Sequence, residues 1–156
     1  MLRKTESGSP SDWLSLAAAD LDAVRLLMEH KVSFRVCRSK LAECFEKLLK
    51  GDLIGRGWKL EKTHDLQRLC DALAAKDAAQ ARVLQTVVDE LAEAYTEDRY
   101  PGFDFDDEED WAGLGGLMKE VEAYASRLQD AQIEAGAERT ANEAATREGD
   151  RCDEVG

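Results

Sequence analysis

Residues 33–50 read SFRVCRSKLAECFEKLLK and carry a clear helical pattern. Their apolar side chains recur at intervals of three and four residues, which brings them to one face of an α-helix. That face comprises Phe34, Cys37, Leu41, Cys44, Phe45, Leu48 and Leu49. We therefore expect a helix from about Ser33 to Lys50, followed by the glycine-containing break at residues 55–57.

The same periodicity predicts four further amphipathic helices on either side of this one. Ser11 and Thr63 are polar residues that can accept a backbone N–H, so we expect them to cap the first and the third helix. Pro101 follows the fourth helix and cannot continue it. The four expected helices are Asp12–Glu29, His64–Ala75, Ala79–Glu97 and Glu108–Ile133.

Short connections between helices of similar length predict antiparallel neighbours, and no segment alternates as a β-strand does. The expected fold is all-α, an up-and-down antiparallel bundle of four to five helices over residues 11–133. Residues 1–10 lack an apolar pattern and are expected to form a flexible arm. Residues 134–156 are acidic and polar with almost no large apolar side chain, so we expect a disordered tail.

The net charge of −12 is unevenly distributed along the chain. Residues 101–156 hold 16 acidic and 5 basic side chains, whereas residues 31–68 hold ten basic and five acidic ones. An anionic partner therefore remains compatible with the second and third helices, although a solvated helix surface explains the same charges.

Several classes of protein are excluded by missing patterns. No apolar run is long enough to span a bilayer, and the first residues lack the apolar segment of a signal peptide, so we expect a cytoplasmic protein. The Gly-rich phosphate loop, the nucleophile elbow and the zinc-protease motif are all missing. Cys37, Cys44, Cys70 and Cys152 form no zinc-ligand spacing and fit buried thiols in a reducing compartment.

The acidic run from Asp104 to Asp110 alternates as the ligands of a calcium loop do, but it lacks two required residues. Glu109 occupies the position that needs glycine, and Gly115 the position that needs a bidentate glutamate. We expect a solvated helix start, with no metal ion and no cofactor bound to the chain.

His64 is the more informative of the two histidines, because the pattern places it at a helix start near Lys59 and Lys62. Exposed helix N–H groups and neighbouring lysines can hold a phosphate. The alternative is a polar side chain that packs on a neighbouring helix. His30 ends the first helix, where a histidine favours the helix dipole.

Four blocks of residues, in this order, resemble the HEPN domain family, the higher eukaryotes and prokaryotes nucleotide-binding domains. The blocks are Ala17-Ala18-Ala19-Asp20-Leu21-Asp22-Ala23, the helix that ends Phe45-Glu46-Lys47-Leu48-Leu49-Lys50, Lys62-Thr63-His64-Asp65-Leu66, and Leu91 to Tyr95 followed by Arg99-Tyr100-Pro101. The resemblance covers about residues 12–130 and implies a helical bundle that usually forms a homodimer.

The resemblance also implies a link to nucleotide binding, RNA cleavage or toxin–antitoxin pairs with small nucleotidyltransferases. The family's ribonucleases have an arginine followed four to six residues later by histidine. His64 lacks that arginine: Lys59 stands with four residues between, while Arg56 has seven. The one literal match, Arg25 to His30, lies in the first helix, where the two side chains project about 140° apart.

We therefore expect a non-catalytic or weakly catalytic HEPN protein that binds a nucleotide or RNA phosphate through a basic surface on the second and third helices. The residues expected there are Lys47, Lys62, His64, Arg99 and Tyr100. One alternative is a metal-independent ribonuclease, with His64 as general acid–base and Lys59 or Arg99 in place of the missing arginine. The other is a protein-interaction module that partners a small nucleotidyltransferase, with no membrane contact.

Overall fold

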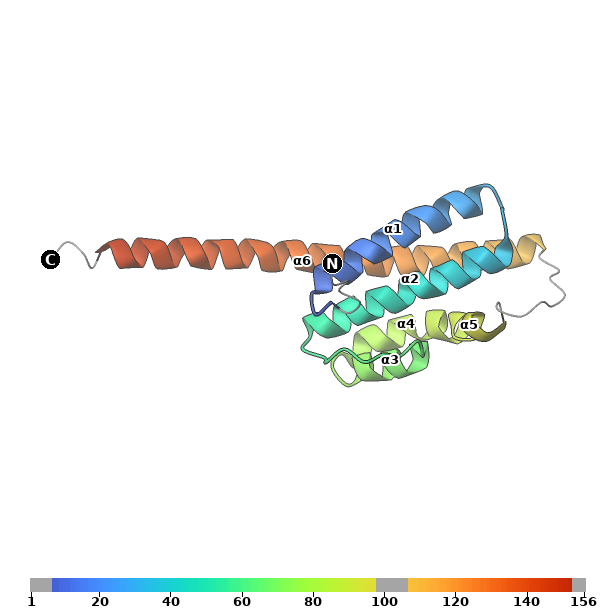
Figure 1. The fold of residues 1–156 in the computed structure, drawn as a ribbon, viewed down its shortest axis with the longest axis horizontal. Coiled ribbons are helices and arrows are strands. Elements are labelled where there is room, and N and C mark those ends of the chain that lie inside the picture. The colour runs from blue at the N-terminus through green and yellow to red at the C-terminus, as the bar shows by residue number, and fades with distance from the viewer. Residues whose placement is uncertain (1–6, 98–106, 153–156) are drawn as a thin grey trace, which may run out of the picture.

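The computed structural model describes residues 7–97 and 107–152, and these residues form helices joined by short connections. They contain no β-strand, so the expected all-α fold is confirmed. Figure 1 shows the shorter helices gathered beside one part of a long helix, which continues beyond the bundle. The elements are α1 (Pro10–Glu29), α2 (Phe34–Gly55), α3 (Leu66–Ala74), α4 (Ala78–Leu91), α5 (Ala94–Glu97) and α6 (Glu108–Cys152).

Two of the expected helix starts are wrong by one turn or less. α1 begins at Pro10 with Ser9 as its N-cap, because proline fits the first helical position. α3 is capped by Asp65, whose side chain accepts from the Arg68 N–H at 3.1 Å. Thr63 instead accepts from the Asp65 N–H, so His64 lies in the loop before the helix.

The expected fourth helix is divided in the structure. α4 ends at Leu91 and α5 begins at Ala94, while the stop signal at residues 99–102 lies outside the described residues. Leu91, Ala92, Glu93 and Ala94 are all good helix formers. The sequence therefore carries no local signal for the break.

α6 is much longer than the expected helix Glu108–Ile133, since it continues through Cys152. Residues 134–152 were expected to belong to a disordered tail, yet the structure has them as a helix that projects from the bundle (Figure 1). Their alanine, glutamate and arginine side chains have high helix propensity, which the absence of a core face does not remove. The division of the chain into arm, bundle and tail remains a prediction.

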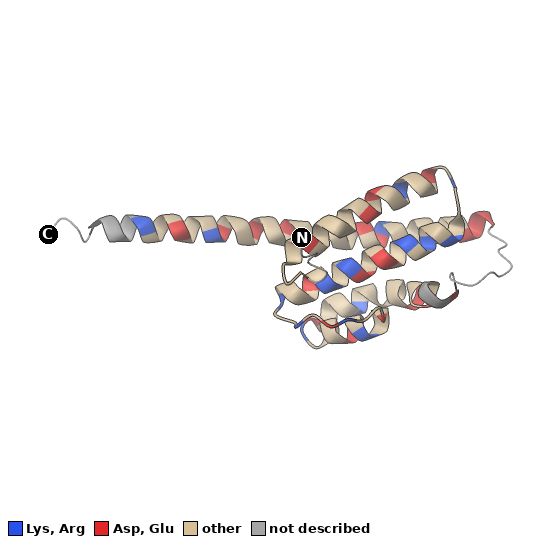
Figure 2. Cartoon of the chain, viewed as in Figure 1, with Lys and Arg blue, Asp and Glu red and all other residues tan. Residues whose placement is uncertain are grey.

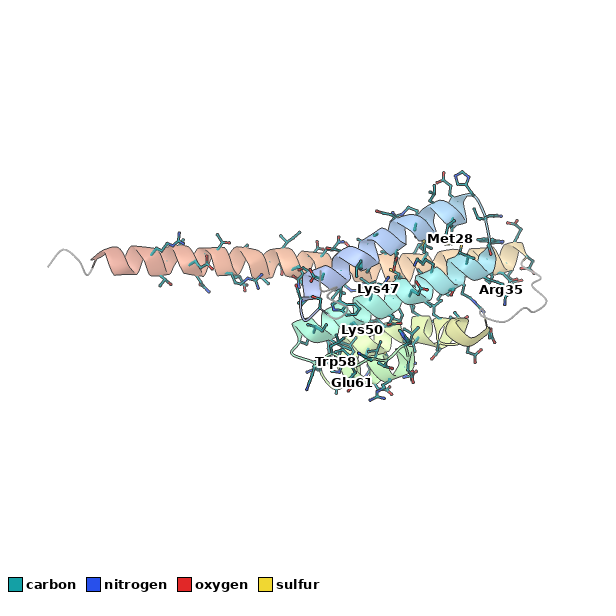
Figure 3. The ribbon with its side chains drawn as sticks, viewed as in Figure 1. Met28, Arg35, Lys47, Lys50, Trp58 and Glu61 are labelled. Atoms are coloured by element: carbon teal, nitrogen blue, oxygen red, sulfur yellow. The ribbon has the colours of Figure 1, made fainter. Side chains whose placement is uncertain are left out.

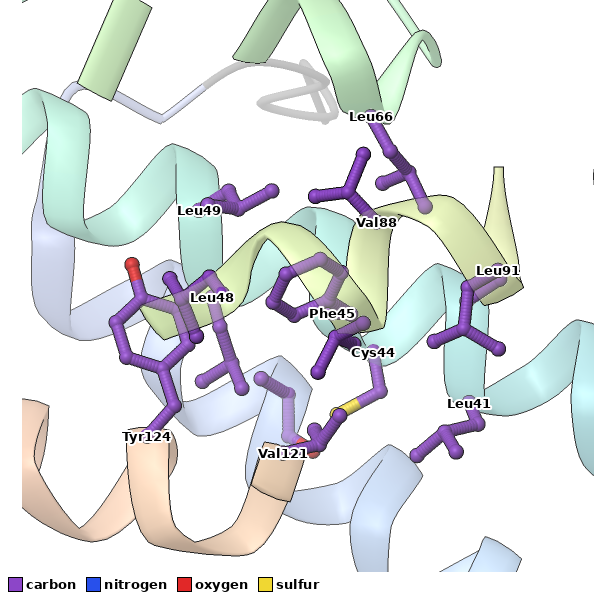
Figure 4. Packing of buried hydrophobic residues seen from close by; sticks show 14 of the residues in the cluster. Leu41, Cys44, Phe45, Leu48, Leu49, Leu66, Val88, Leu91, Val121 and Tyr124 are labelled. Carbon is purple, nitrogen blue, oxygen red and sulfur yellow. The ribbon is translucent and has the colours of Figure 1, made fainter. Parts of the chain in front are cut away.

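The core is a single cluster to which every long helix contributes. α1 packs along α2, α3 along α4, and α6 contacts α1, α2 and α4. Figure 4 shows Phe45 of α2 and Tyr124 of α6 within this cluster. Their ring centroids lie 6.1 Å apart in an edge-to-face arrangement. The cysteines Cys37, Cys44 and Cys70 are buried in this cluster as free thiols.

None of the helices in the described parts of the chain is both long and apolar enough to cross a membrane. Figure 2 shows charges of both signs along α2 and an acidic first turn on α6. In that turn, Asp107 and Asp110 each accept the other's backbone N–H, at 2.9 and 3.1 Å. These two carboxylates therefore cap the helix start.

Candidate functional site

A pocket of about 360 Å³ lies between the start of α1, the middle of α2 and the loop that precedes α3. We call it the α2 pocket. It combines one aromatic ring with three lysines, three glutamates and a histidine. Its lining residues are Trp13, Glu43, Glu46, Lys47, Lys50, Leu60, Glu61, Lys62, Thr63 and His64.

A buried ion pair forms the inner wall of the α2 pocket. The Lys50 Nζ lies 2.7 Å from the Glu46 Oε1, and the two side chains are only 6% and 7% exposed. The residues are one helical turn apart, so α2 itself sets the geometry of the pair. A buried charge needs a partner, and each of these groups supplies the other's.

His64 joins the same carboxylate from the opposite wall. Its Nδ1 lies 3.1 Å from both oxygens of Glu46, and 71% of its side chain is exposed. Because an ionised carboxylate only accepts, Nδ1 is the ring nitrogen that carries the hydrogen. The contact fixes the tautomer of the imidazole, and the exposed ring lines the pocket.

The loop of residues 58–65 is folded against the end of α2 by backbone bonds. Gly57 has a φ of +84°, a conformation that glycine adopts without strain, and it turns the chain back after α2. The Trp58 N–H then donates to the Leu53 carbonyl at 2.9 Å. Figure 3 shows Trp58 and Glu61 beside α3, across from Lys47 and Lys50 on α2.

Lys47 is held by an acidic residue of α1. Its Nζ forms an ion pair with Asp20, which also lies 3.4 Å from the Lys40 Nζ. A hydrogen bond from Lys40 to Glu43 raises the pKa of Lys40, so this ammonium stays charged. Lys47 therefore lines the pocket as part of an ion-pair network with Asp20 and Lys40.

Trp13 covers the buried pair from the start of α1. The Lys50 Nζ lies 5.4 Å from the centre of the indole ring, within the range of a cation–π contact. The indole Nε1 donates to the Ser7 carbonyl at 2.7 Å, which fixes the ring plane. Gly51 makes this approach of α1 close, since a Cβ there would lie 3.3 Å from the Trp13 Cβ.

The structure brings three of the five expected site residues into one pocket. Lys47 comes from α2, and Lys62 and His64 come from the loop. Arg99 and Tyr100 lie outside the described residues. Lys59 is exposed and does not line the pocket.

Sequence reasoning missed Trp13, Glu46 and Lys50. A signal for Glu46 and Lys50 was present in the sequence. Each directly follows a core residue of α2, Phe45 or Leu49, and the two are one helical turn apart. The spacing of Trp13 from Ala17 and Leu21 predicts a core position in the first helix, but the side chain is only half-buried. Its neighbour Leu14 takes the core position instead.

The comparison with protein-family models decides what kind of domain holds this pocket. The HEPN domain model matches residues 10–128, which is most of the chain. The chain belongs to the HEPN domain family. The comparison with curated proteins and the one with solved structures found no match.

The HEPN family is of nucleotide-binding or ribonuclease type. In this HEPN chain, the residues that match the arginine–histidine pattern, Arg25 and His30, lie outside the α2 pocket. Arg25 is ion-paired with Glu122 and Asp22, and His30 is the C-cap of α1. Arg56 pairs with Asp52 at 2.7 Å and lines another cavity. None of these basic residues lines the α2 pocket.

No group of three or more histidine, cysteine or acidic side chains that could hold a metal ion occurs within residues 7–97 and 107–152. Part of the acidic run that resembled a calcium loop, residues 104–106, lies outside the described residues. The expectation that this HEPN chain works without a metal or cofactor stays a prediction. The chemistry available in the α2 pocket is that of ammonium, imidazole and carboxylate groups.

Proposed function

We propose that the α2 pocket of this HEPN chain binds the phosphate group of a nucleotide or of RNA. The observation that carries the proposal is the convergence of Lys47, Lys62 and His64 on one pocket, although α2 and the loop supply them separately. Lysine and histidine N–H groups are the side-chain donors that hold phosphate oxygens.

The exposure of the basic side chains indicates which of these groups a phosphate meets first. The Lys47 side chain is 25% exposed beside Asp20, and the Lys50 side chain is only 6% exposed against Glu46. Lys62 and His64 are both exposed on the loop. We therefore infer that the loop supplies the principal phosphate contacts, while the α2 lysines offset the three glutamates of the lining.

Trp13 supports a nucleotide or RNA in preference to inorganic phosphate. Its half-buried indole lines the same pocket, and Leu60 contributes a second apolar surface. Stacking of a base on an aromatic ring is worth about 1–3 kcal/mol and does not depend on base identity. A base against Trp13 with its phosphate toward Lys62 is therefore the arrangement that we favour.

The test is a titration of ¹⁵N-labelled protein with AMP and with a short single-stranded RNA, followed by NMR. We expect saturable shifts of the Trp13 indole signal and of the amides of residues 60–64, and their loss in Lys62→Ala. Lys119→Ala is the matched control, because Lys119 is exposed on α6 outside the pocket. Arg99→Ala and Tyr100→Ala test the two remaining expected residues. Shifts that are absent with both probes, or unchanged in Lys62→Ala, would contradict the proposal.

The His64–Glu46 hydrogen bond favours a second candidate, a metal-independent ribonuclease. A carboxylate that holds one ring nitrogen leaves the other to exchange a proton with the ribose 2′-hydroxyl. Neither Arg56 nor Arg25 supports the pocket, so Lys62 would have to stabilise the phosphate in the transition state.

Cleavage of a labelled mixed-sequence RNA in EDTA tests this second candidate. If the HEPN chain is a ribonuclease, the wild type cuts, His64→Ala does not, and Glu46→Gln is impaired with an altered pH profile. Lys119→Ala again serves as the control. RNA that stays intact with the wild type would leave binding alone as the function of the pocket.

A further inference from the structure

Three glutamates line the α2 pocket together with its three lysines, although phosphate oxygens are bound by donors and an ionised carboxylate only accepts. Glu46 belongs to the buried pair with Lys50. Glu43 and Glu61 differ from it, because 37% and 47% of their side chains are exposed. Phosphate binding by itself does not explain why these two carboxylates line the pocket.

Glu43 and Glu61 are more accessible than the α2 lysines in the same lining. The Lys47 and Lys50 side chains are only 25% and 6% exposed. Lys62 is exposed, and it directly follows Glu61 in the loop. An anion that enters the pocket therefore meets the most accessible lysine of the lining beside an acidic side chain.

Ion pairs hold both carboxylates in place. The Lys40 Nζ lies 2.8 Å from the Glu43 Oε2, and the Arg68 Nη2 lies 2.8 Å from the Glu61 Oε2. Neither Lys40 nor Arg68 lines the α2 pocket. In each pair the acidic member thus belongs to the lining, and the basic member lies outside it.

The start of α3, next to the pocket, is already occupied by another acidic side chain. Backbone N–H groups at a helix start can bind phosphate. Here the Asp65 Oδ1 accepts from the Arg68 N–H at 3.1 Å. Asp65 is exposed and directly follows His64, so a further carboxylate borders the pocket on the loop side.

We propose that Glu43 and Glu61 restrict the α2 pocket to nucleotide units with a single phosphate group and exclude nucleoside diphosphates and triphosphates. The accepted unit is a nucleoside monophosphate or one unit of an RNA chain. One phosphate can lie against Lys62 and His64, whereas each additional phosphate has to lie beside a carboxylate, where like charges oppose binding. This inference rests on the proposed function and adds which nucleotides the pocket accepts.

The size of the pocket agrees with a single unit. Its volume of about 360 Å³ is near the lower end of the range of about 300–1,000 Å³ that is typical of small-molecule sites. A base against Trp13 and one phosphate at the loop use the apolar and the basic parts of the lining. The remaining part of the lining is acidic.

Titrations of ¹⁵N-labelled protein with AMP, ADP and ATP test the exclusion. EDTA is present throughout, so that no metal ion neutralises the additional phosphates, and the Trp13 indole signal reports binding. We expect the dissociation constant to rise with each phosphate, by roughly tenfold or more from AMP to ATP. A short single-stranded RNA, titrated in parallel, distinguishes the two sources of a single phosphate. Binding tighter than that of AMP identifies a unit of an RNA chain, and weaker binding identifies a free monophosphate.

The double variant Glu43→Gln with Glu61→Gln removes both negative charges and keeps the size of the side chains. It should bind ATP roughly tenfold more tightly than the wild type does, so that the ATP and AMP dissociation constants become about equal. Glu134→Gln with Glu138→Gln is the matched control, since it changes the net charge equally at exposed positions of α6 outside the pocket. Exposed ion pairs contribute little to stability, so circular dichroism should show that both double variants fold.

Three results would overturn the inference while leaving the proposed function in place. They are a wild type that binds ATP at least as tightly as AMP, a ratio of the two constants that is unchanged in Glu43→Gln with Glu61→Gln, and a ratio that falls equally in the control. Each of them requires that AMP or the RNA binds. A wild type that binds neither AMP nor the RNA would overturn the proposed function, and the inference with it.

Discussion

The Tyr124 hydroxyl donates to the Asp52 Oδ2 at 2.7 Å, although the two residues are 72 positions apart in the chain. The hydroxyl belongs to a fully buried side chain of α6, and the carboxylate to a side chain of α2 that is 6% exposed. The other oxygen of Asp52 accepts from the Arg56 Nε at 2.7 Å. The Tyr124–Asp52 hydrogen bond therefore fixes the long helix α6 to α2 and gives the buried carboxylate a donor.

Removal of this hydroxyl should destabilise the domain. Tyr124→Phe leaves the ring in place against Phe45 but takes one donor from a buried carboxylate, at a cost of about 2 kcal/mol. Urea denaturation measures the change in the free energy of unfolding. Ser126→Ala, at an exposed position of α6, is the control and should change it little. Equal stabilities of the two variants would show that the hydrogen bond contributes nothing.

The same tyrosine should make stability fall at alkaline pH. Burial, and then the nearby Asp52 carboxylate, raise the pKa of Tyr124 well above its ordinary value of 10.0. A raised pKa means that the stabilising contribution is complete below about pH 10 and is lost as the pH rises further. The free energy of unfolding of the wild type should thus decline more steeply above pH 10 than that of Tyr124→Phe. Parallel pH profiles would contradict this assignment.

Two glycines should respond in opposite ways to replacement by alanine. At Gly51 a Cβ would lie 3.1 Å from the Leu14 Cδ2 and 3.3 Å from the Trp13 Cβ, so Gly51→Ala should push α1 outward and cost about 1–3 kcal/mol. At Gly113 of α6 nothing lies within 4 Å, and Gly113→Ala should stabilise by about 1 kcal/mol through helix propensity. Thermal unfolding compares them, and the same sign for both would refute the packing argument.

Much of the fold could be predicted because helical periodicity is strong in this chain. The core stripe of the second helix lies buried in α2 as expected, from Cys37 to Leu49. The break between α4 and α5 could not be predicted, since residues 91–94 all favour a helix. The helix beyond Ile133 was missed because a segment without a core face was taken to be disordered, although its propensity is high.

The candidate site was only partly accessible from sequence, for a geometric reason. Charge, spacing and the family resemblance together predicted Lys47, Lys62 and His64, but not the buried pair of Glu46 and Lys50 in the same pocket. A charged residue on a helix is normally solvated, and only the fold of the loop over α2 reveals that these two are covered. The position of Trp13 in the pocket likewise could not be predicted, because it depends on the close approach of α1 to Gly51.

The last prediction concerns the buried pair of Glu46 and Lys50. It compares how much Glu46 and His64 each contribute to the free energy of unfolding. Glu46→Ala leaves the Lys50 ammonium buried without its carboxylate, so the free energy of unfolding should fall by about 3–5 kcal/mol. Glu46→Leu combined with Lys50→Met removes both charges and should stay within about 1 kcal/mol of the wild type, because apolar side chains replace the pair. His64→Ala should cost less than about 1 kcal/mol, since the imidazole is 71% exposed. Urea denaturation of the three variants measures these differences. A Glu46→Ala variant as stable as His64→Ala would mean that water reaches Lys50 and that the inner wall of the α2 pocket is open.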